Sequence, residues 1–283
     1  MKNLFKSIFI AVFPVFAMYV LINSSLHLIQ HDFPFRYLGR LLSALTIVVF
    51  FAGLFITSQA RTSRNLNIYS SFILLGFITS LVFGGIIENS DVLGSSMSFI
   101  LVLCWIAYLR CYSVFENRDV SILKVGIKLP TFELEDSSKN KIASETFLGN
   151  PTIYLFFRGN WCPLCMAQIK EIASQYKDLE KRGVNMVMIS PQPHQFSKSL
   201  AEKYNLGFHF LTDFNNTVAK QLGIFAENGI PTGFQVLGYD SDTVLPTVII
   251  TDTNGKIIFA DLTDNYRVRP EPETFLKVID ALS

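Results

Sequence analysis

The chain has little charge. Only 17% of its 283 residues are Asp, Glu, Lys or Arg, against about 25% in a typical soluble domain, so part of it suits an apolar environment. The formal net charge of +1 excludes a strongly basic nucleic-acid-binding protein. Half of the residues are hydrophobic, which excludes a disordered chain. Four cysteines are too few for the disulfide framework of a small secreted protein.

The charge that is present is unevenly distributed. The first 125 residues hold nine basic and five acidic side chains, whereas residues 126–283 hold 15 basic and 18 acidic ones. The first part is therefore poor in charge and net positive, and the second has the composition of a slightly acidic globular domain. We predict a transmembrane region at 1–112, a linker at 113–125 and a folded domain at 126–283.

Four apolar runs separate the charges of the first part. They lie at 7–31, 41–60, 65–87 and 92–109. A helix needs about 20 apolar residues, within a range of about 17–25, to cross a bilayer, so the pattern predicts an all-α bundle of four transmembrane helices. Pro14 lies inside the first run, where membrane helices tolerate proline. The alternative for the first run is a cleavable signal peptide, which its length and the three further runs disfavour.

Lysine and arginine residues near these runs predict the orientation, because cytoplasmic loops carry an excess of both. The side that carries only two of them holds Arg36 and Arg40. The other side holds seven, namely Lys2, Lys6, Arg61, Arg64, Arg110, Arg118 and Lys124. We therefore expect a multi-pass cell-membrane protein whose two termini and folded domain face the cytoplasm.

Two pairs of side chains in the first part are minor candidates. His27 and His31 are four residues apart at a helix end and form either a metal ligand pair or, as we favour, two solvated interfacial side chains. Cys104 and Cys111 are seven residues apart and can share a helix face. They either relay electrons to the folded domain or, as we favour, pack as small apolar residues.

Alternation and apolar runs in the second part predict a mixed α/β domain. Strands are expected at 131–136, 151–157, 184–190, 245–252 and 255–262, and helices at 162–182, 196–204, 218–222 and 271–282. A strand–helix–strand unit of this length gives a parallel pair with a right-handed crossover. Asn254-Gly255 marks a hairpin between the last two strands. We expect a mixed sheet with helices on both faces and an inserted loop at 227–242.

The segment Cys-Pro-Leu-Cys at 162–165 is the main chemical signal. It follows a predicted buried strand and a short turn, and Pro163 suits the first turn of a helix. A thiol at a helix N-terminus meets free N–H groups and the positive end of the helix dipole, which lowers its pKa into a range of about 3.5–7.5. Cys162 is therefore predicted to be the more acidic and more exposed nucleophile. Cys165, one turn later, is the predicted resolving thiol, which releases a mixed disulfide.

Zinc binding is the alternative for a Cys-x-x-Cys segment. A structural zinc ion needs four ligands, usually with a second pair of cysteines. The other two cysteines lie in or beside the apolar runs, and His194 and His209 lack the spacing of a zinc knuckle. We therefore expect no metal and no other cofactor.

Four segments of the second part read VGIKLPTFELEDSSKNKIASETFLGNPTIYLFFRGNWCPLC, VNMVMISPQ, FHFLTDFNNTVAKQLGI and LPTVIITDTNGKIIFADL. Together they resemble the peroxiredoxin-like branch of the AhpC/TSA family, over about residues 125–282. The junction of a strand with the Cys-Pro-x-Cys segment is the most specific part. The resemblance implies a thioredoxin fold and thiol-based reduction of peroxides or disulfides.

The sequence departs from this family at the positions that activate peroxide. Peroxiredoxins have a proline seven and a threonine three residues before the peroxide-reactive cysteine, where this chain has Leu155 and Gly159. They also have an arginine on a later strand, where this chain reads Leu245-Pro246-Thr247. Arg158 is the candidate for a replacement guanidinium.

Pro246, Thr247 and Trp161 are the remaining candidates that shape the site. Thioredoxin-like proteins place a cis-proline beside the Cys-x-x-Cys segment, so the resemblance implies a cis peptide bond before Pro246; the alternative is a trans proline that opens a strand. Trp161 resembles the thioredoxin pattern and is expected to cover the site with an apolar surface, unless it packs as an ordinary core residue.

Taken together, these features predict a membrane-anchored thiol-disulfide oxidoreductase that uses Cys162 and Cys165. Its expected partners are the lipid bilayer, a protein disulfide and an unidentified thiol electron donor, with no nucleic acid. A thiol-dependent peroxidase acting on hydroperoxides is the first alternative. A redox sensor coupled to the membrane bundle is the second.

Overall fold

The computed structural model describes residues 2–30, 35–87, 92–115, 118 and 121–282. The chain divides into two compact units. One contains Phe5–Ser58 and Thr62–Val114, and the other contains Phe115–Ser283 with the short segments Met1–Leu4 and Gln59–Arg61. The boundary between Val114 and Phe115 falls inside the predicted linker at 113–125.

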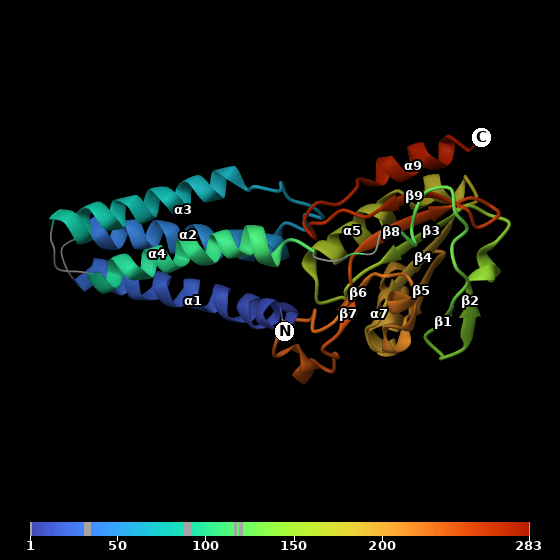
Figure 1. Ribbon diagram of the computed structural model, residues 1–283, viewed down its shortest axis with the longest axis horizontal. Helices are drawn as coiled ribbons and strands as arrows, with labels where there is room; N and C mark the ends of the chain where they lie inside the picture. The colour runs from blue at the N-terminus through green and yellow to red at the C-terminus, as the bar shows by residue number, and fades with distance from the viewer. Residues whose placement is uncertain (1, 31–34, 88–91, 116–117, 119–120, 283) are drawn as a thin grey trace. The chain divides into compact units, whose positions relative to one another are not determined.

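The helical unit contains four antiparallel helices in the part that the structure describes (Figure 1). Three apolar helices are long enough to cross a membrane, at Asn3–Gln30, Tyr37–Ile56 and Asn67–Gly84, whereas the fourth apolar stretch, Ser96–Tyr112, is shorter. Three of the four predicted spans are therefore helices long enough to cross a membrane, whereas the fourth is shorter than the length required. The elements are α1 (Lys2–Gln30), α2 (Phe35–Ile56), α3 (Asn67–Ser80) with η1 (Leu81–Ile87), and α4 (Val92–Ala107) with η2 (Tyr108–Tyr112).

Small residues allow α2 and α3 to approach closely. A Cβ atom on Gly39 would lie 2.5 Å from the carbonyl oxygen of Gly76, so the two backbones touch. Ser43, one turn after Gly39, donates its hydroxyl hydrogen to the carbonyl oxygen of Ile73 at 2.9 Å. Close backbone approach through small residues is typical of helix pairs in membranes.

Arg40 lies within a helix rather than beside one. The sequence places it outside the apolar run at 41–60, but α2 begins at Phe35, and Arg40 is buried with its guanidinium 4.5 Å from the ring centroid of Tyr37. His27 stacks on the same ring at 4.9 Å. His31, the other member of the predicted histidine pair, lies outside the described residues. Cys104 is half-buried and Cys111 is exposed, both with free thiols.

The second unit is built on a seven-stranded mixed sheet, in the order β2-β1-β5-β4-β3-β8-β9. The central pairs β3–β4 and β4–β5 are parallel, whereas β3–β8 and β8–β9 are antiparallel. The predicted parallel pair, hairpin and mixed sheet are therefore confirmed. The strands are β1 (Glu133–Glu135), β2 (Lys141–Ala143), β3 (Thr152–Phe156), β4 (Asn185–Ser190), β5 (Phe208–Thr212), β8 (Thr247–Thr251) and β9 (Ile257–Asp261).

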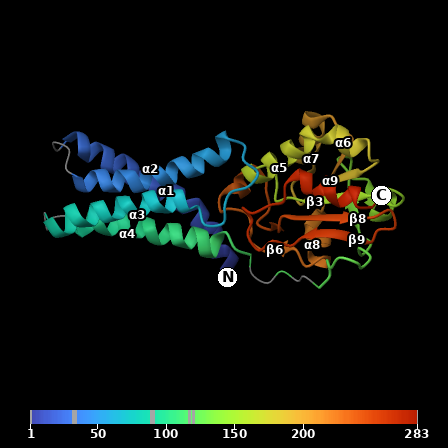
Figure 2. The same ribbon diagram turned by 90° about the horizontal axis from the view of Figure 1, so that it is seen from above.

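Helices flank this sheet on both faces, as Figure 2 shows. On one face, Val218 and Leu222 at α8 join Tyr154 and Phe156 of β3 in the main hydrophobic cluster. On the other face, α6, α7 and α9 contact the strands through the ring pairs Tyr176–Phe208, Tyr204–Phe210 and Phe259–Phe275. This arrangement confirms the predicted thioredoxin-like fold. The helices are α5 (Pro163–Ser174), α6 (Tyr176–Glu180), α7 (His194–Tyr204), α8 (Thr217–Gln221) and α9 (Pro272–Asp280), with 3-10 turns η3 (Ser144–Phe147) and η4 (Phe214–Asn216).

Three features of the second unit differ from the predictions. The strand β5, which pairs in parallel with β4, was not predicted. The helix expected over 162–182 is interrupted at Gln175, whose φ of −103° and ψ of 11° are not helical, so it forms α5 and α6. The loop expected at 227–242 is enclosed by a small antiparallel pair, β6 (Phe225–Ala226) and β7 (Thr243–Val244). The segment 227–242, here called the insert, contains one 3-10 turn, η5 (Phe234–Leu237).

Candidate active site

Cys162 is the residue immediately before α5. Its backbone is extended, with φ −88° and ψ 110°, and Pro163 occupies the first helical position. Its carbonyl oxygen already accepts a helical hydrogen bond from the N–H of Met166 at 3.0 Å. The strand β3 ends at Phe156, so a buried strand, a short loop and a helix N-terminus hold Cys162 at the edge of the sheet, as predicted.

Both sulfur atoms of the Cys-x-x-Cys segment are buried. Cys162 is 2% exposed and Cys165 is fully buried, and both are free thiols joined by a hydrogen bond between their side chains. Cys162 is the more exposed of the two, as predicted, but only by this small margin, and neither side chain lies at the surface. Position at a helix N-terminus did not determine exposure, because the surrounding packing buries both side chains.

The two thiols have opposite shifts in acidity. Burial and the hydrogen bond with Cys165 raise the pKa of the Cys162 thiol well above its ordinary value. The pKa of the Cys165 thiol is well below its ordinary value: burial opposes this, but the hydrogen bond from Cys162 and the charge of Arg269 outweigh it. The predicted order of acidity is therefore reversed, because a guanidinium contacts Cys165.

Arg269 is the residue that the sequence analysis missed. It is 6% exposed, and its Nη2 atom lies 3.4 Å from the Sγ atom of Cys165. Two further hydrogen bonds fix the guanidinium, from Nη1 to Oε1 of Gln168 at 2.9 Å and from Nε to the carbonyl oxygen of Tyr266 at 3.0 Å. The Arg-Val-Arg-Pro run at 267–270 was the available signal, but nothing local indicates that it reaches α5.

The loop between β3 and Cys162 depends on a glycine. Gly159 has φ +146°, and a Cβ atom there would lie 2.7 Å from Nε1 of Trp161. The Arg158 guanidinium lies 4.7 Å from the ring centroid of Trp161, within the range of a cation–π contact. Trp161 and the buried Arg158 are thus brought together, and Gly159, where the family has threonine, leaves room for the indole ring.

The insert contacts three residues of this loop. Arg158 donates a hydrogen bond to the carbonyl oxygen of Gly229. Tyr239 donates its hydroxyl hydrogen to Oδ1 of Asn160. The rings of Trp161 and Phe234 meet edge to face, with centroids 5.4 Å apart. The insert therefore fastens the loop that carries Cys162.

Pro246 and Thr247 lie at the start of β8, in register with the end of β3. Thr247 pairs with Phe156, so both residues are at the sheet edge from which the cysteine loop departs. The implied cis bond before Pro246 is wrong, since none of the peptide bonds in the described part of the chain is cis. The chain crosses from β7 to β8 through Leu245 and Pro246 alone, and Leu245 is held by a 2.7 Å hydrogen bond to Ile224, so an extended trans connection suffices.

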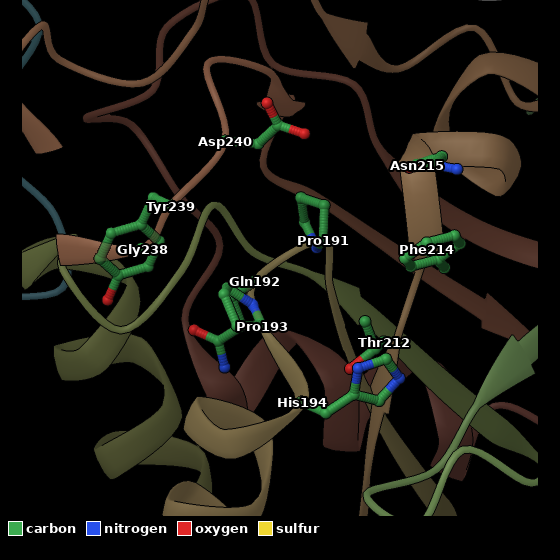
Figure 3. A pocket seen from close by; sticks show the side chains of 10 residues that line it. All are labelled: Pro191, Gln192, Pro193, His194, Thr212, Phe214, Asn215, Gly238, Tyr239 and Asp240. Atoms are coloured by element: carbon green, nitrogen blue, oxygen red, sulfur yellow. The ribbon is translucent and has the colours of Figure 1, made fainter. Parts of the chain in front are cut away.

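A pocket of about 410 Å³ adjoins this loop. Figure 3 shows Tyr239 on one side of it and His194 with Thr212 on the other. Its residue Gln192 accepts a hydrogen bond from the N–H of Asn160 at 2.8 Å, which joins the pocket wall to the cysteine loop. The zinc candidate His194 instead contacts Oε2 of Glu135 at 2.7 Å. Within the described residues, no group of three or more His, Cys, Asp and Glu side chains is placed to hold a metal.

Comparisons with known proteins agree with this geometry. The model of the AhpC/TSA family matches residues 125–260. Peroxiredoxin Q of Sedum lineare is 30% identical over 109 residues, which are 38% of this chain and 59% of that protein. The thiol-disulfide oxidoreductase ResA of Bacillus subtilis is 25% identical and covers 56% of this chain and 78% of its own length. Peroxiredoxin Bcp of Escherichia coli is 27% identical and covers 51% and 90%.

The solved structures that resemble this chain cover 56–57% of it. The peroxiredoxin-like protein from Aquifex aeolicus has 16% sequence identity and a TM-score of 0.48, over 57% of this chain and 88% of that one. The chain spans only about half of the length of the plant peroxiredoxin Q proteins that it matches, from 44% to 59%. The match to the AhpC/TSA family model lies entirely within the second unit of this chain.

Proposed function

We propose that the chain is a thiol-disulfide oxidoreductase whose reacting groups are Cys162 and Cys165. The observation that carries this proposal is the buried, hydrogen-bonded thiol pair at the N-terminus of α5 with a guanidinium against one sulfur. Such a pair exchanges two electrons with a disulfide through a mixed-disulfide intermediate. Cys162 makes the first attack, because it lies at the end of the loop and is the less deeply buried of the two.

Three features support exchange with disulfides over reaction with peroxide. Cys165 lies in hydrogen-bond contact with Cys162, so a resolving thiol is already in place. Gly159 offers no hydroxyl group where peroxiredoxins have threonine, and the Trp161 ring occupies that space. Arg269 contacts Cys165 rather than Cys162, so it supports resolution more directly than the first attack.

Peroxidase activity remains the second candidate function. It is favoured by the relatives, several of which are named peroxiredoxins, and by Arg158, whose charge opposes the upward shift of the Cys162 pKa caused by burial. In that case Cys162 is the sulfur that attacks the hydroperoxide, and Cys165 then forms a disulfide with it. In both cases an external thiol must restore the reduced pair.

We also propose that the helical unit anchors the chain in the cell membrane and that the folded domain faces the cytoplasm. Three helices of sufficient length and apolar composition support the anchor. The excess of Lys and Arg on one side of the apolar runs supports the orientation. The pocket whose residue Gln192 contacts Asn160, two residues before Cys162, is the proposed space for the substrate's side chains.

The experiment is a comparison of two activities in one preparation. The full chain in detergent is assayed with dithiothreitol as reductant and either insulin or a hydroperoxide as oxidant. We expect faster turnover with insulin, abolished in Cys162→Ser and strongly reduced in Cys165→Ser, and unchanged in Cys111→Ser, which removes an exposed thiol of the helical unit. Fast hydroperoxide turnover with negligible insulin reduction would favour the peroxidase instead.

A further inference from the structure

A buried arginine in this protein contacts the second sulfur of the thiol pair rather than the first. Arg269 comes from the segment between β9 and α9, and its Nη2 atom lies 3.4 Å from Sγ of Cys165. The two remaining partners, Gln168 and the carbonyl of Tyr266, hold the guanidinium plane in place from two directions. Gln168 is itself 2% exposed, so the group has little freedom to turn away.

The charge of this guanidinium needs a counter-charge. Arginine keeps its proton in proteins, and a buried charge is costly unless it is paired and hydrogen-bonded. Among the hydrogen-bond partners that the structure describes for Arg269, the amide of Gln168 and the carbonyl of Tyr266 are neutral. The Cys165 sulfur is the partner that becomes an anion by losing a proton.

We propose that Arg269 holds Cys165 as a thiolate and thereby sets the rate at which the mixed disulfide on Cys162 is resolved. The proposal rests on the proposed exchange function.

The exchange has two steps. In the first step, the Cys162 thiolate attacks a substrate disulfide; one sulfur of the substrate becomes bonded to Cys162, and the other leaves as a thiolate that takes a proton from water. In the second step, the Cys165 thiolate attacks Sγ of Cys162. The bond from Cys162 to the substrate breaks, a Cys162–Cys165 disulfide forms, and the second substrate sulfur leaves with its electron pair and takes a proton from water.

The opposite pKa shifts of the two thiols agree with first attack by Cys162 and resolution by Cys165. In the reduced pair, the proton of Cys162 is shared with the Cys165 sulfur through their hydrogen bond, so transfer of that proton to Cys165 gives the Cys162 thiolate for the first attack. Cys165 then loses this proton to water before it attacks as a thiolate. Once Cys162 is in the mixed disulfide, it no longer donates a hydrogen bond. Arg269 then still contacts Cys165 and stabilises its anion, together with the backbone N–H group of Arg158.

The test separates the two steps by the two thiols they release. The full chain, with Cys104 and Cys111 changed to alanine, is reduced and mixed rapidly with 5,5′-dithiobis(2-nitrobenzoate). Attack by Cys162 releases one equivalent of thionitrobenzoate, and resolution by Cys165 releases the second. We expect Arg269→Gln to slow the second step by about tenfold or more and the first step by a clearly smaller factor, because the guanidinium contacts Cys165 rather than Cys162 and the reactive species in each step is the thiolate. Arg269→Lys, which keeps the charge, should be intermediate.

Two further measurements keep the test decisive. Arg182→Gln, which removes a surface arginine paired with Asp280 at 2.6 Å, should leave both rates unchanged. In Cys162→Ser, ultraviolet titration of the thiolate should give Cys165 a pKa below the ordinary value of about 8.5, and this needs no change at Arg269. Equal slowing of both steps in Arg269→Gln and Arg269→Lys, or an ordinary Cys165 pKa, would overturn the proposal. A wild type that releases no thionitrobenzoate would overturn the proposed function as well.

Discussion

The hydroxyl group of Tyr239 donates a hydrogen bond to Oδ1 of Asn160, and Asn160 lies two residues before Cys162. This bond is one of the contacts through which the insert holds the cysteine loop, beside Arg158–Gly229 and Trp161–Phe234. Because both sulfurs are buried, a reagent reaches them only when these contacts open.

We therefore predict that Tyr239→Phe makes Cys162 more reactive toward iodoacetamide. Loss of one hydrogen bond costs about 0.5–1.5 kcal/mol, which raises the opened population by roughly two- to tenfold. The stacking of this ring on Phe196 at 4.9 Å is retained. The rate is measured by mass spectrometry of the modified peptide, with Tyr204→Phe, a ring that stacks on Phe210, as control. An unchanged rate at Cys162 would mean that the insert is not what limits access.

Gly159→Ala should lower both stability and exchange activity. The backbone at φ +146° disfavours alanine, and the new Cβ atom would meet the Trp161 ring at 2.7 Å. Backbone strain of this kind costs about 1–3 kcal/mol, and displacement of the indole ring adds to it. Gly149→Ala is the matched control, since Gly149 also has a positive φ, +94°, but open space around its Cβ position. If thermal unfolding and insulin reduction respond equally to both substitutions, the Trp161 contact has no separate effect.

The reduced thiol pair should make stability depend on pH with a maximum near the pKa of an unfolded thiol, about 8.5. The lowered pKa of Cys165 adds stability as pH rises from its folded value toward 8.5, since the unfolded chain binds more protons in that window. The raised pKa of Cys162 removes stability above about pH 8.5, where the folded chain binds more protons. The unfolding temperature of the reduced wild type is compared with that of Cys162→Ala/Cys165→Ala between about pH 6 and pH 10. A difference that falls steadily across that range would contradict the opposite shifts.

Reporter fusions after Lys124 and at the C-terminus should both indicate the cytoplasm. The prediction follows from seven Lys and Arg residues on one side of the apolar runs against two on the other. Because three helices are clearly long enough to span and the fourth stretch is shorter, the site after Lys124 tests whether α4 crosses. Strong alkaline phosphatase activity at that site, with a cytoplasmic N-terminus, would mean that only three helices cross.

Local pattern was enough to predict much of this protein. The runs predicted as buried strands at 151–157 and 184–190 contain β3 and β4, which are fully or nearly fully buried, because a strand covered on both faces needs no polar alternation. Pro163 after Cys162 placed the start of α5 correctly, because proline fits the first helical turn. The strands β2, β5, β6 and β7 were missed. Two or three residues carry too little periodicity for β2, β6 and β7 to be recognised, and the exposed His209 interrupts the apolar run of β5.

The chemistry of the site also has a part that the local sequence predicts and a part that depends on tertiary contacts. The spacing of Cys162 and Cys165 and their position at a helix start are properties of one segment, so the sequence by itself determined that two thiols meet there. The tertiary structure decided which thiol is acidic and whether either is exposed. Arg269 reaches Cys165 from 104 residues away, the insert covers the loop from 71 to 79 residues away, and the two strands that Pro246 joins leave its peptide bond trans. The charge, burial and backbone conformation of a site depend on the distant segments that pack against it. The residue spacing within one segment does not predict that packing.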